Sequence, residues 1–176
     1  MTLRTYEAVS DELMYVRTPK CAGLTMEKTF LGLYKNTCIK VSPANVIALN
    51  DIVTTFAVAR NPWDRLVSLF EYYQKNYDTY KDMDFEDWFF RNDLKFPTFL
   101  ADRCYIQYMD FYLKFEDLEN EVNNKISKYE ERIHLSHYNK TERRFSSLKD
   151  YFTTQEMIDT VADLNKYVIN AIGYDF

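Results

Sequence analysis

Glycine and proline are scarce in this sequence: the chain of 176 residues contains 3 glycines and 4 prolines. No segment is rich in glycine, serine or proline, and no segment repeats. Flexible linkers and low-complexity tails depend on such residues, so their scarcity argues against both. With 47% hydrophobic and 17% aromatic residues, the chain can bury a substantial core. We therefore expect a single domain over residues 1–176.

Cysteine and histidine are also few, which argues against several kinds of site. The cysteines, Cys21, Cys38 and Cys104, are odd in number and form no CxxC pair, so neither a disulfide framework nor a thiolate zinc site is expected. His134 and His137 lie close together without a cluster of carboxylates or thiolates beside them. Because a structural metal site needs such a cluster, we expect no metal.

Long apolar runs are missing as well. The opening stretch MTLRTYEAVSDEL lacks the continuous apolar core of a signal peptide, and no later run approaches the length that a membrane span needs. We expect a soluble, cytoplasmic protein without a membrane span.

Positive charge is in the minority, since the formal net charge is −5. We therefore expect no nucleic-acid partner. The basic residues are nevertheless concentrated in the stretch 132–149, where every charged residue except Glu142 is a lysine or an arginine. A site for an anionic ligand and a solvated basic face both fit this stretch.

Short runs of β-branched and aromatic residues predict buried strands at 13–17, 53–59 and 111–115. A helical pattern follows each of these runs. Strands that alternate with helices predict a parallel sheet, whose ligands collect beyond the carboxyl ends of the strands. The expected fold class is α/β, with a central, mainly parallel sheet flanked by helices.

The helix after the second strand has the clearest predicted start. Asn61 suits the N-cap, Pro62 the first helical position and Asp64 the third, through side-chain capping, a fixed φ angle and complementarity to the helix dipole. The other expected helices are 84–91, 116–129 and 154–172, the last of which ends at Gly173 as a C′ residue.

The turn after the first strand, within YVRTPKCAGLT, carries the first candidate chemistry. Lys20 comes ahead of Gly23 and Thr25, whereas a phosphate-cradling GxxxxGK[ST] loop places its lysine at the far end. Backbone N–H groups at the opening of a helix attract anions, and Thr25 and Lys20 add a hydroxyl and a positive charge. An ordinary surface turn fits the same residues.

The turn after the second strand repeats this arrangement. Arg60 ends the strand, and Ser68 lies on the next helix outside its apolar stripe. An arginine and a serine so placed can hold a second phosphate. Pairing of Arg60 with a carboxylate and a packing role for Ser68 are the ordinary alternatives.

Two anion sites at neighbouring strand ends fit a ligand with two separated anionic groups, and here the residues resemble a known family. TPKCAGLT resembles the 5′-phosphosulfate loop of sulfotransferases, and FAVARNPWDRLVSLFEYY is very similar to the 3′-phosphate motif of the carbohydrate sulfotransferase branch. FYLKFEDLENEV, LSHYNKTERR and a long helix ending in GYDF follow that branch in order. The resemblance covers most of the chain and implies a three-layer, P-loop-like fold.

The resemblance also implies a co-substrate, 3′-phosphoadenosine 5′-phosphosulfate, and no metal. Lys20 is then the catalytic residue, in contact with the sulfate and the bridging oxygen. The residues implied to hold the 5′ end are Lys20, the backbone of Cys21, Ala22, Gly23 and Leu24, and the hydroxyl of Thr25. Those implied for the 3′-phosphate are Arg60 and Ser68, and those of a loop that closes over the donor are Lys140, Arg143 and Arg144.

The sequence departs from the family pattern at two points. Leu24 stands where the family usually has serine or threonine, and no histidine lies between the two phosphate motifs, where Val41 is near the usual place. General-base catalysis needs a group that accepts the proton of the acceptor hydroxyl. The candidates for this base are Glu27, Asp51, Glu71, His134 and His137.

The expected activity is transfer of a sulfuryl group to a hydroxyl acceptor, with a glycan as the expected acceptor class. The short chain resembles a bare catalytic core of bacterial or viral type. Two alternatives stay open: a phosphotransferase like the P-loop kinases, and a non-catalytic relative that binds a nucleotide or a partner protein. The identity of the acceptor and the oligomeric state stay open as well.

Overall fold

The structure is a computed structural model that describes residues 13–18, 20–26, 29, 53–91, 109–126, 135 and 143–176. These residues form two compact units. The first contains the described residues up to Arg60 together with 109–126 and 135, and the second contains 61–91 and 143–176. The single domain expected over the whole chain stays a prediction.

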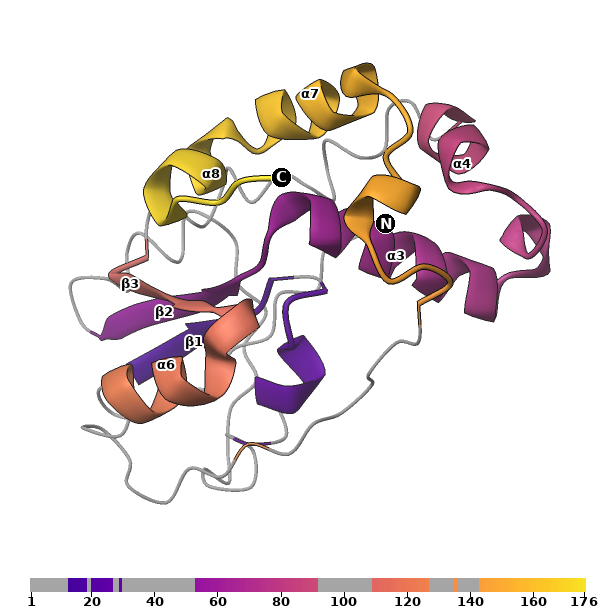
Figure 1. The fold of residues 1–176 in the computed structure, drawn as a ribbon. Helices are drawn as coiled ribbons and strands as arrows, with labels where there is room; N and C mark the ends of the chain where they lie inside the picture. The colour runs from indigo at the N-terminus through magenta and orange to yellow at the C-terminus, as the bar shows by residue number, and fades with distance from the viewer. Residues whose placement is uncertain are drawn as a thin grey trace. The chain divides into compact units, whose positions relative to one another are not determined.

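The first unit is built on a parallel sheet of three strands (Figure 1). The strands are β1 (Leu13–Val16), β2 (Thr54–Ala59) and β3 (Phe111–Lys114), in the order β1-β2-β3. Both neighbouring pairs are parallel, as expected from the alternation of strands and helices. The α/β class and the parallel sheet are thus confirmed for this part of the chain, while the three-layer, P-loop-like arrangement stays a prediction.

Both faces of the sheet are apolar, which is why its strands read as continuous hydrophobic runs. Successive side chains of a strand point to opposite faces, so β2 contributes Phe56 and Val58 to one face and Ala57 to the other. On the first face the ring of Phe56 stacks on that of Phe111, with centroids 5.3 Å apart. On the second face Ala57 packs with Met14 and Val16 of β1.

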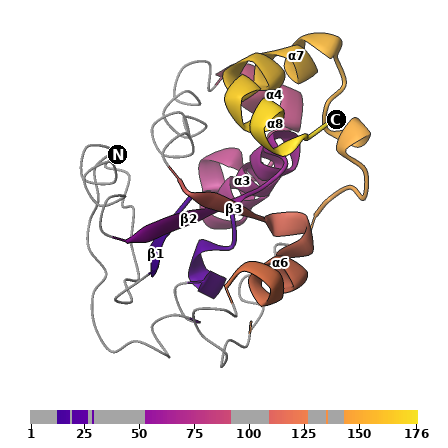
Figure 2. The same ribbon diagram turned by 90° about the vertical axis from the view of Figure 1, so that its left-hand side faces the viewer.

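Helix α6 (Leu118–Lys125) follows β3 after a 3₁₀ turn, η4 (Phe115–Asp117), and lies next to that strand (Figure 2). Its Val122 is buried against the sheet. At the end of the helix the Lys125 ammonium donates to the Tyr112 carbonyl at 2.8 Å and pairs with Glu121 at 2.6 Å. The helix expected over 116–129 is therefore present, but it begins two residues late and ends at Lys125 with Ile126 as its C-cap; residues 127–129 lie outside the described part.

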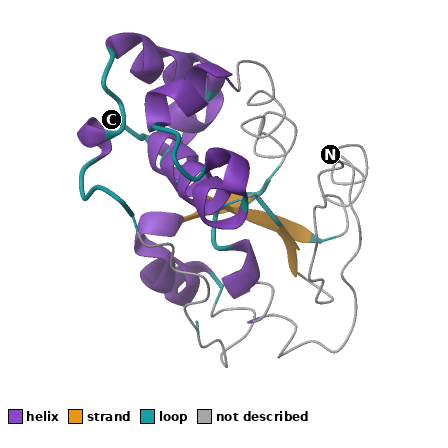
Figure 3. Ribbon diagram, turned by 90° about the vertical axis from the view of Figure 1, so that its right-hand side faces the viewer, coloured by secondary structure: helices purple, strands orange, loops and turns teal. Residues whose placement is uncertain are grey.

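The described part of the second unit contains helices and loops but no strand (Figure 3). Its α-helices are α3 (Pro62–Asn76), α4 (Phe85–Arg91), α7 (Gln155–Leu164) and α8 (Lys166–Ile172), with 3₁₀ turns η1 (Asp78–Tyr80) and η5 (Leu148–Asp150). The apolar stripe expected on α3 consists of Leu66, Leu69, Phe70 and Tyr73. The first three are buried in one cluster with Trp88 of α4 and Met157 of α7, and Tyr73 is half-buried against that cluster. Among the described residues of the chain, no helix combines the length and the apolar character that crossing a membrane requires.

The prediction of one helix over 154–172 is wrong, because the chain breaks at Asn165 into α7 and α8. Asn165 has φ −112° and ψ 15°, and its side-chain amide donates to the Val161 carbonyl at 2.9 Å. This side chain competes with the backbone for a helical carbonyl, which is the reason that asparagine is a poor residue inside helices. The predicted stop is confirmed, since Gly173 has φ 79° and its N–H donates to the Ile169 carbonyl at 2.8 Å.

The predicted start of α3 is confirmed in detail. The Asn61 side-chain oxygen accepts from the N–H groups of Trp63 and Asp64, at 3.1 and 3.2 Å, and Pro62 occupies the first helical position. The side-chain nitrogen of Asn61 donates to the Asp175 carbonyl at 2.8 Å, so one residue caps the helix and fastens the C-terminal segment.

We expect Asn61→Ala to lower the free energy of unfolding by about 1 kcal/mol, because the substitution removes the cap. Asn61→Asp is the matched control, since a carboxylate keeps the acceptor and lacks the amide donor to Asp175. Urea unfolding measures both variants. Equal losses in the two variants would contradict the capping role.

Candidate functional site

The turn after β1 is held in a backbone conformation that few side chains adopt. Lys20 has φ 62° and Ala22 has φ 53°, both in the left-handed region. A residue with a side chain in this region costs roughly 1 kcal/mol, so the surrounding structure has to hold it there. Residues 23–26 then turn into a helix, with the Met26 N–H bonded to the Ala22 carbonyl at 3.0 Å.

Two hydrogen bonds hold the start of this turn. The hydroxyl of Thr18, which is 1% exposed, donates to the Val58 carbonyl of β2. The Cys21 N–H points back to the Thr18 carbonyl at 3.4 Å. Cys21 is buried and is not part of a disulfide, as expected of a small core residue. The turn is therefore fixed both to itself and to the neighbouring strand.

Gly23 is required here because the side chain of Arg17 lies against it. A Cβ atom built on Gly23 would be 2.5 Å from Nε and 2.9 Å from Cγ of Arg17. Both distances are shorter than van der Waals contact. Cγ lies in the middle of the Arg17 side chain and not at its flexible end. Gly23, in the turn predicted to bind an anion, thus leaves space for the side chain of Arg17.

Arg60, which follows β2 directly, reaches this turn. Its Nη1 donates to the Lys20 carbonyl at 2.9 Å, and its guanidinium carbon lies 4.2 Å from the centroid of the Phe115 ring. Arg60 is 8% exposed. The structure therefore brings together Lys20 and Arg60, two residues predicted for the site, and places both at the carboxyl ends of neighbouring parallel strands.

The charge state of Lys20 is sensitive to pH near neutrality. Burial lowers the pKa of the Lys20 ammonium to about 8, and the positive charge of Arg60 acts in the same direction, while Cys21 opposes it. An anion bound at this position would favour the charged form. Lys20 can therefore neutralise negative charge at neutral pH and loses that ability as the pH rises, whereas Arg60 stays charged.

The other predicted residues fall into three groups. Ser68 is buried on α3 of the second unit, and Arg143 and Arg144 also belong to that unit, so a phosphate held jointly by Arg60 and Ser68 stays a prediction. In the first unit, Thr25 is buried, and Leu24 is half-buried. The predicted residues that lie outside the described residues are Glu27, Asp51, His134, His137 and Lys140.

Glu71 is the described member of the set of candidate bases. It is 8% exposed, and its Oε1 accepts from the Arg144 N–H at 3.1 Å and from the Tyr151 hydroxyl. Burial first, and then the hydrogen bond to Glu71, raise the pKa of Tyr151 to about 12. This carboxylate oxygen is already engaged by two donors within the second unit.

Sequence reasoning missed three residues that shape the site: Arg17, Thr18 and Phe115. Phe115 directly follows β3, and Thr18 comes two residues after β1. A signal for both was present, because residues beyond the carboxyl ends of parallel strands are where ligand sites form. The contact between Arg17 and Gly23 had no such signal, since it depends on the exact path of the turn.

Comparisons with protein-family models, with curated proteins and with solved structures found no match for this chain. Among the described residues, no group of three or more histidine, cysteine, aspartate or glutamate side chains is placed to hold a metal ion.

We expect Gly23→Ala to destabilise the first unit by about 1–3 kcal/mol, because the new methyl group overpacks the turn against Arg17. The double variant Arg17→Ala/Gly23→Ala is the control. If the clash is the cause, removal of the arginine stem makes the second substitution much less costly. Urea unfolding of the two single variants and the double variant measures this coupling, and additive losses would contradict the contact.

We expect the affinity for 3′-phosphoadenosine 5′-phosphate to fall as the pH rises above 8, because Lys20 then loses its proton in the free protein. The fall is at most about tenfold per pH unit for one proton. Calorimetry at pH 7, 8 and 9 measures it. Lys20→Arg is the matched control, since its side chain stays charged over this range. An equally steep fall in that variant would assign the titration to another group.

Proposed function

We propose that the protein transfers a sulfuryl group from 3′-phosphoadenosine 5′-phosphosulfate to a hydroxyl group, with a glycan as the expected acceptor. The observation that carries the proposal is the pair of cationic residues at neighbouring strand ends, in which Arg60 donates to the carbonyl of a left-handed Lys20 at 2.9 Å. The resemblance of TPKCAGLT and RNPWDRLVS to the two phosphate motifs of sulfotransferases supports the same conclusion.

The chemistry is an in-line displacement at sulfur. The acceptor oxygen forms a bond to sulfur while the bond between sulfur and the bridging oxygen breaks, and the bridging oxygen leaves with the electron pair on 3′-phosphoadenosine 5′-phosphate. The proton of the acceptor hydroxyl goes to a base that stays unassigned among the candidates. Lys20 neutralises the charge that grows on the bridging oxygen, and positioning supplies much of the remaining rate.

The position of the lysine favours this reaction over phosphotransfer of the P-loop kinase type. In a P-loop the lysine comes at the end of the loop and reaches the β- and γ-phosphates of a nucleoside triphosphate. Here Lys20 comes before the helix that opens at 23–26. The residue after β2 is Arg60, where a P-loop enzyme uses an aspartate to hold Mg²⁺.

We expect Lys20→Ala to lower sulfuryl transfer from radiolabelled donor by on the order of a hundredfold or more, because it removes a preorganised charge from the transition state. Lys81→Ala, which removes an exposed lysine of the second unit, is the control and should leave the rate unchanged. Circular dichroism checks that both variants fold. Turnover like that of the wild type in Lys20→Ala would overturn the proposal.

Calorimetry with the wild-type protein separates the remaining alternatives. Preference for 3′-phosphoadenosine 5′-phosphate over ATP with Mg²⁺ is the expected result, and the reverse preference would assign the site to a phosphotransferase. Binding of the bisphosphate without turnover on a panel of glycans and small alcohols would indicate a non-catalytic relative.

A further inference from the structure

A residue beyond the carboxyl end of each strand takes part in one series of contacts. Lys20 lies in the turn after β1, Arg60 directly follows β2, and Phe115 directly follows β3. The strands are parallel, so their carboxyl ends lie at the same edge of the sheet. All three residues belong to the first unit, and the contacts among them can therefore be followed within one compact body.

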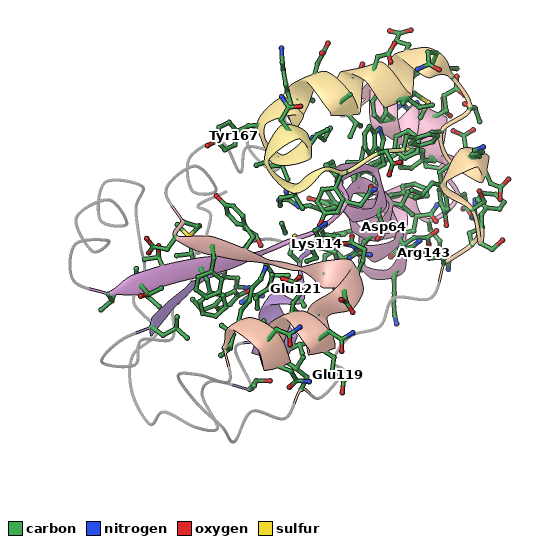
Figure 4. All side chains as sticks on the ribbon, turned by 60° about the vertical axis from the view of Figure 1, so that its left-hand side comes forward. Asp64, Lys114, Glu119, Glu121, Arg143 and Tyr167 are labelled. Carbon is green, nitrogen blue, oxygen red and sulfur yellow. The ribbon has the colours of Figure 1, made fainter. Side chains whose placement is uncertain are left out.

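The register of the sheet explains why Arg60 and Phe115 meet. Ala59 of β2 pairs with Lys114, the last residue of β3, which is labelled in Figure 4. Arg60 and Phe115 are the next residues along the chain, so this pairing places them side by side. The guanidinium carbon of Arg60 lies over the ring of Phe115, 4.2 Å from its centroid. The ring also packs against the apolar cluster that contains Phe56, so the core holds it in place.

An aromatic ring suits position 115 because of the charge that it faces. Arg60 is 8% exposed, and a charge taken out of water needs compensating contacts. The face of an aromatic ring attracts a cation, most strongly where water is excluded. A contact with the ring face uses none of the guanidinium N–H groups, and Nη1 of Arg60 donates to the Lys20 carbonyl at 2.9 Å. A leucine at this position would fill similar space without the attraction.

The hydrogen bond from Arg60 reaches a residue whose backbone conformation needs support. Lys20 has φ 62°, and a residue with a side chain persists in the left-handed region only where its surroundings hold it. The Thr18 hydroxyl ties the start of the turn to Val58, whereas Arg60 bonds to Lys20 itself. The rotamers open to a side chain depend on φ and ψ, so a change of φ at Lys20 would also move its ammonium group.

We propose that Phe115 is a positioning residue for Lys20: its ring holds the guanidinium of Arg60, whose hydrogen bond keeps Lys20 in the backbone conformation that sulfuryl transfer requires. This inference rests on the proposed function for the identity of the reaction. It adds a residue that acts through Arg60 and not by contact with the donor. The residue after each of the three strands then has a part in placing one ammonium group.

Sulfuryl transfer by the full chain at saturating donor tests the role of Phe115. We expect Phe115→Leu to lower kcat by on the order of tenfold, because Arg60 loses the ring that holds it. Phe115→Tyr keeps the ring face and should stay close to the wild type. Phe111→Leu is the matched control, since it makes the same change in β3 where the ring stacks on Phe56, and it should leave kcat unchanged. A loss in Phe111→Leu as large as that in Phe115→Leu would overturn the assignment.

A double substitution tests whether Phe115 acts through Lys20. We expect Lys20→Ala/Phe115→Leu to lose no more of the single-turnover rate than Lys20→Ala alone, because the residue to be positioned is gone. Losses that multiply in the double variant would overturn the positioning role. Circular dichroism checks that each variant folds, and Phe115→Met, which also lacks a ring, takes the place of Phe115→Leu if that variant does not fold.

The titration of the Lys20 ammonium group provides a readout that needs no donor. Burial first, and then the positive charge of Arg60, lower its pKa to about 8, while Cys21 acts in the opposite direction. Phe115→Leu lets the guanidinium move away, so we expect the pKa of Lys20 to rise and the ammonium group to stay charged to higher pH. Phe115→Tyr and Phe111→Leu should leave this pKa unchanged. Nuclear magnetic resonance with isotope-labelled lysine measures it, and Lys20→Arg identifies the signal.

The outcomes separate the positioning role from the proposed function. Arg17, a further charged residue at this turn, is present in every variant, so a rise in the pKa of Lys20 reports on Arg60. An unmoved pKa in Phe115→Leu would overturn the positioning role while the proposed function stands. If that pKa rises but the wild type transfers no sulfuryl group to a panel of glycans and small alcohols, the proposed function fails, and the role of Phe115 in transfer fails with it.

Discussion

The hydrogen bond from Arg60 to the Lys20 carbonyl is the interaction on which the candidate site depends. It joins the residue after β2 to the turn after β1, so two parallel strands that are paired along their length are also tied at their ends. A left-handed residue other than glycine persists only where its surroundings hold it. The hydrogen bond from Arg60 helps to keep Lys20 in this conformation. Arg60 is itself held by the stack of its guanidinium on the ring of Phe115.

This arrangement explains why the turn can do without the glycines of a P-loop. A glycine-rich loop reaches left-handed conformations because it has no Cβ atoms. Here Lys20 and Ala22 adopt them with side chains in place, and the only glycine of the turn, Gly23, is needed for a different reason, the passage of Arg17. The place of Lys20 in this turn has a chemical consequence, because burial first, and then the positive charge of Arg60, lower the pKa of its ammonium group to about 8.

Much of the fold could be predicted from the sequence, and the reasons are local. The strands were found within a residue or two because they are short apolar runs, and the start of α3 was found because Asn61, Pro62 and Asp64 each act on the next few residues. The break at Asn165 was missed, since the apolar stripe continues across it and only the side-chain bond to Val161 interrupts the helix.

The candidate site was predictable only in part, for a physical reason. Lys20 and Arg60 were found because Lys20 lies in the turn after β1 and Arg60 directly follows β2, positions that the sequence reveals. The hydrogen bond between them, however, is accepted by the backbone carbonyl of Lys20. Every residue has such a carbonyl, so the sequence does not reveal this bond. The same holds for Glu71, whose acidic side chain suggested a base, whereas its partners are the Arg144 N–H and the Tyr151 hydroxyl.

The two units therefore use one device with opposite signs. In the first, the buried guanidinium of Arg60 donates to the backbone carbonyl of Lys20, and in the second the buried carboxylate of Glu71 accepts from the backbone N–H of Arg144. In both cases the buried side chain bonds to the backbone of a charged residue. A charge fixed in this way needs little reorganisation when an anion arrives, which is the condition under which electrostatic stabilisation is most effective. In the reaction we propose, the position of Lys20 thus depends on the hydrogen bond from Arg60.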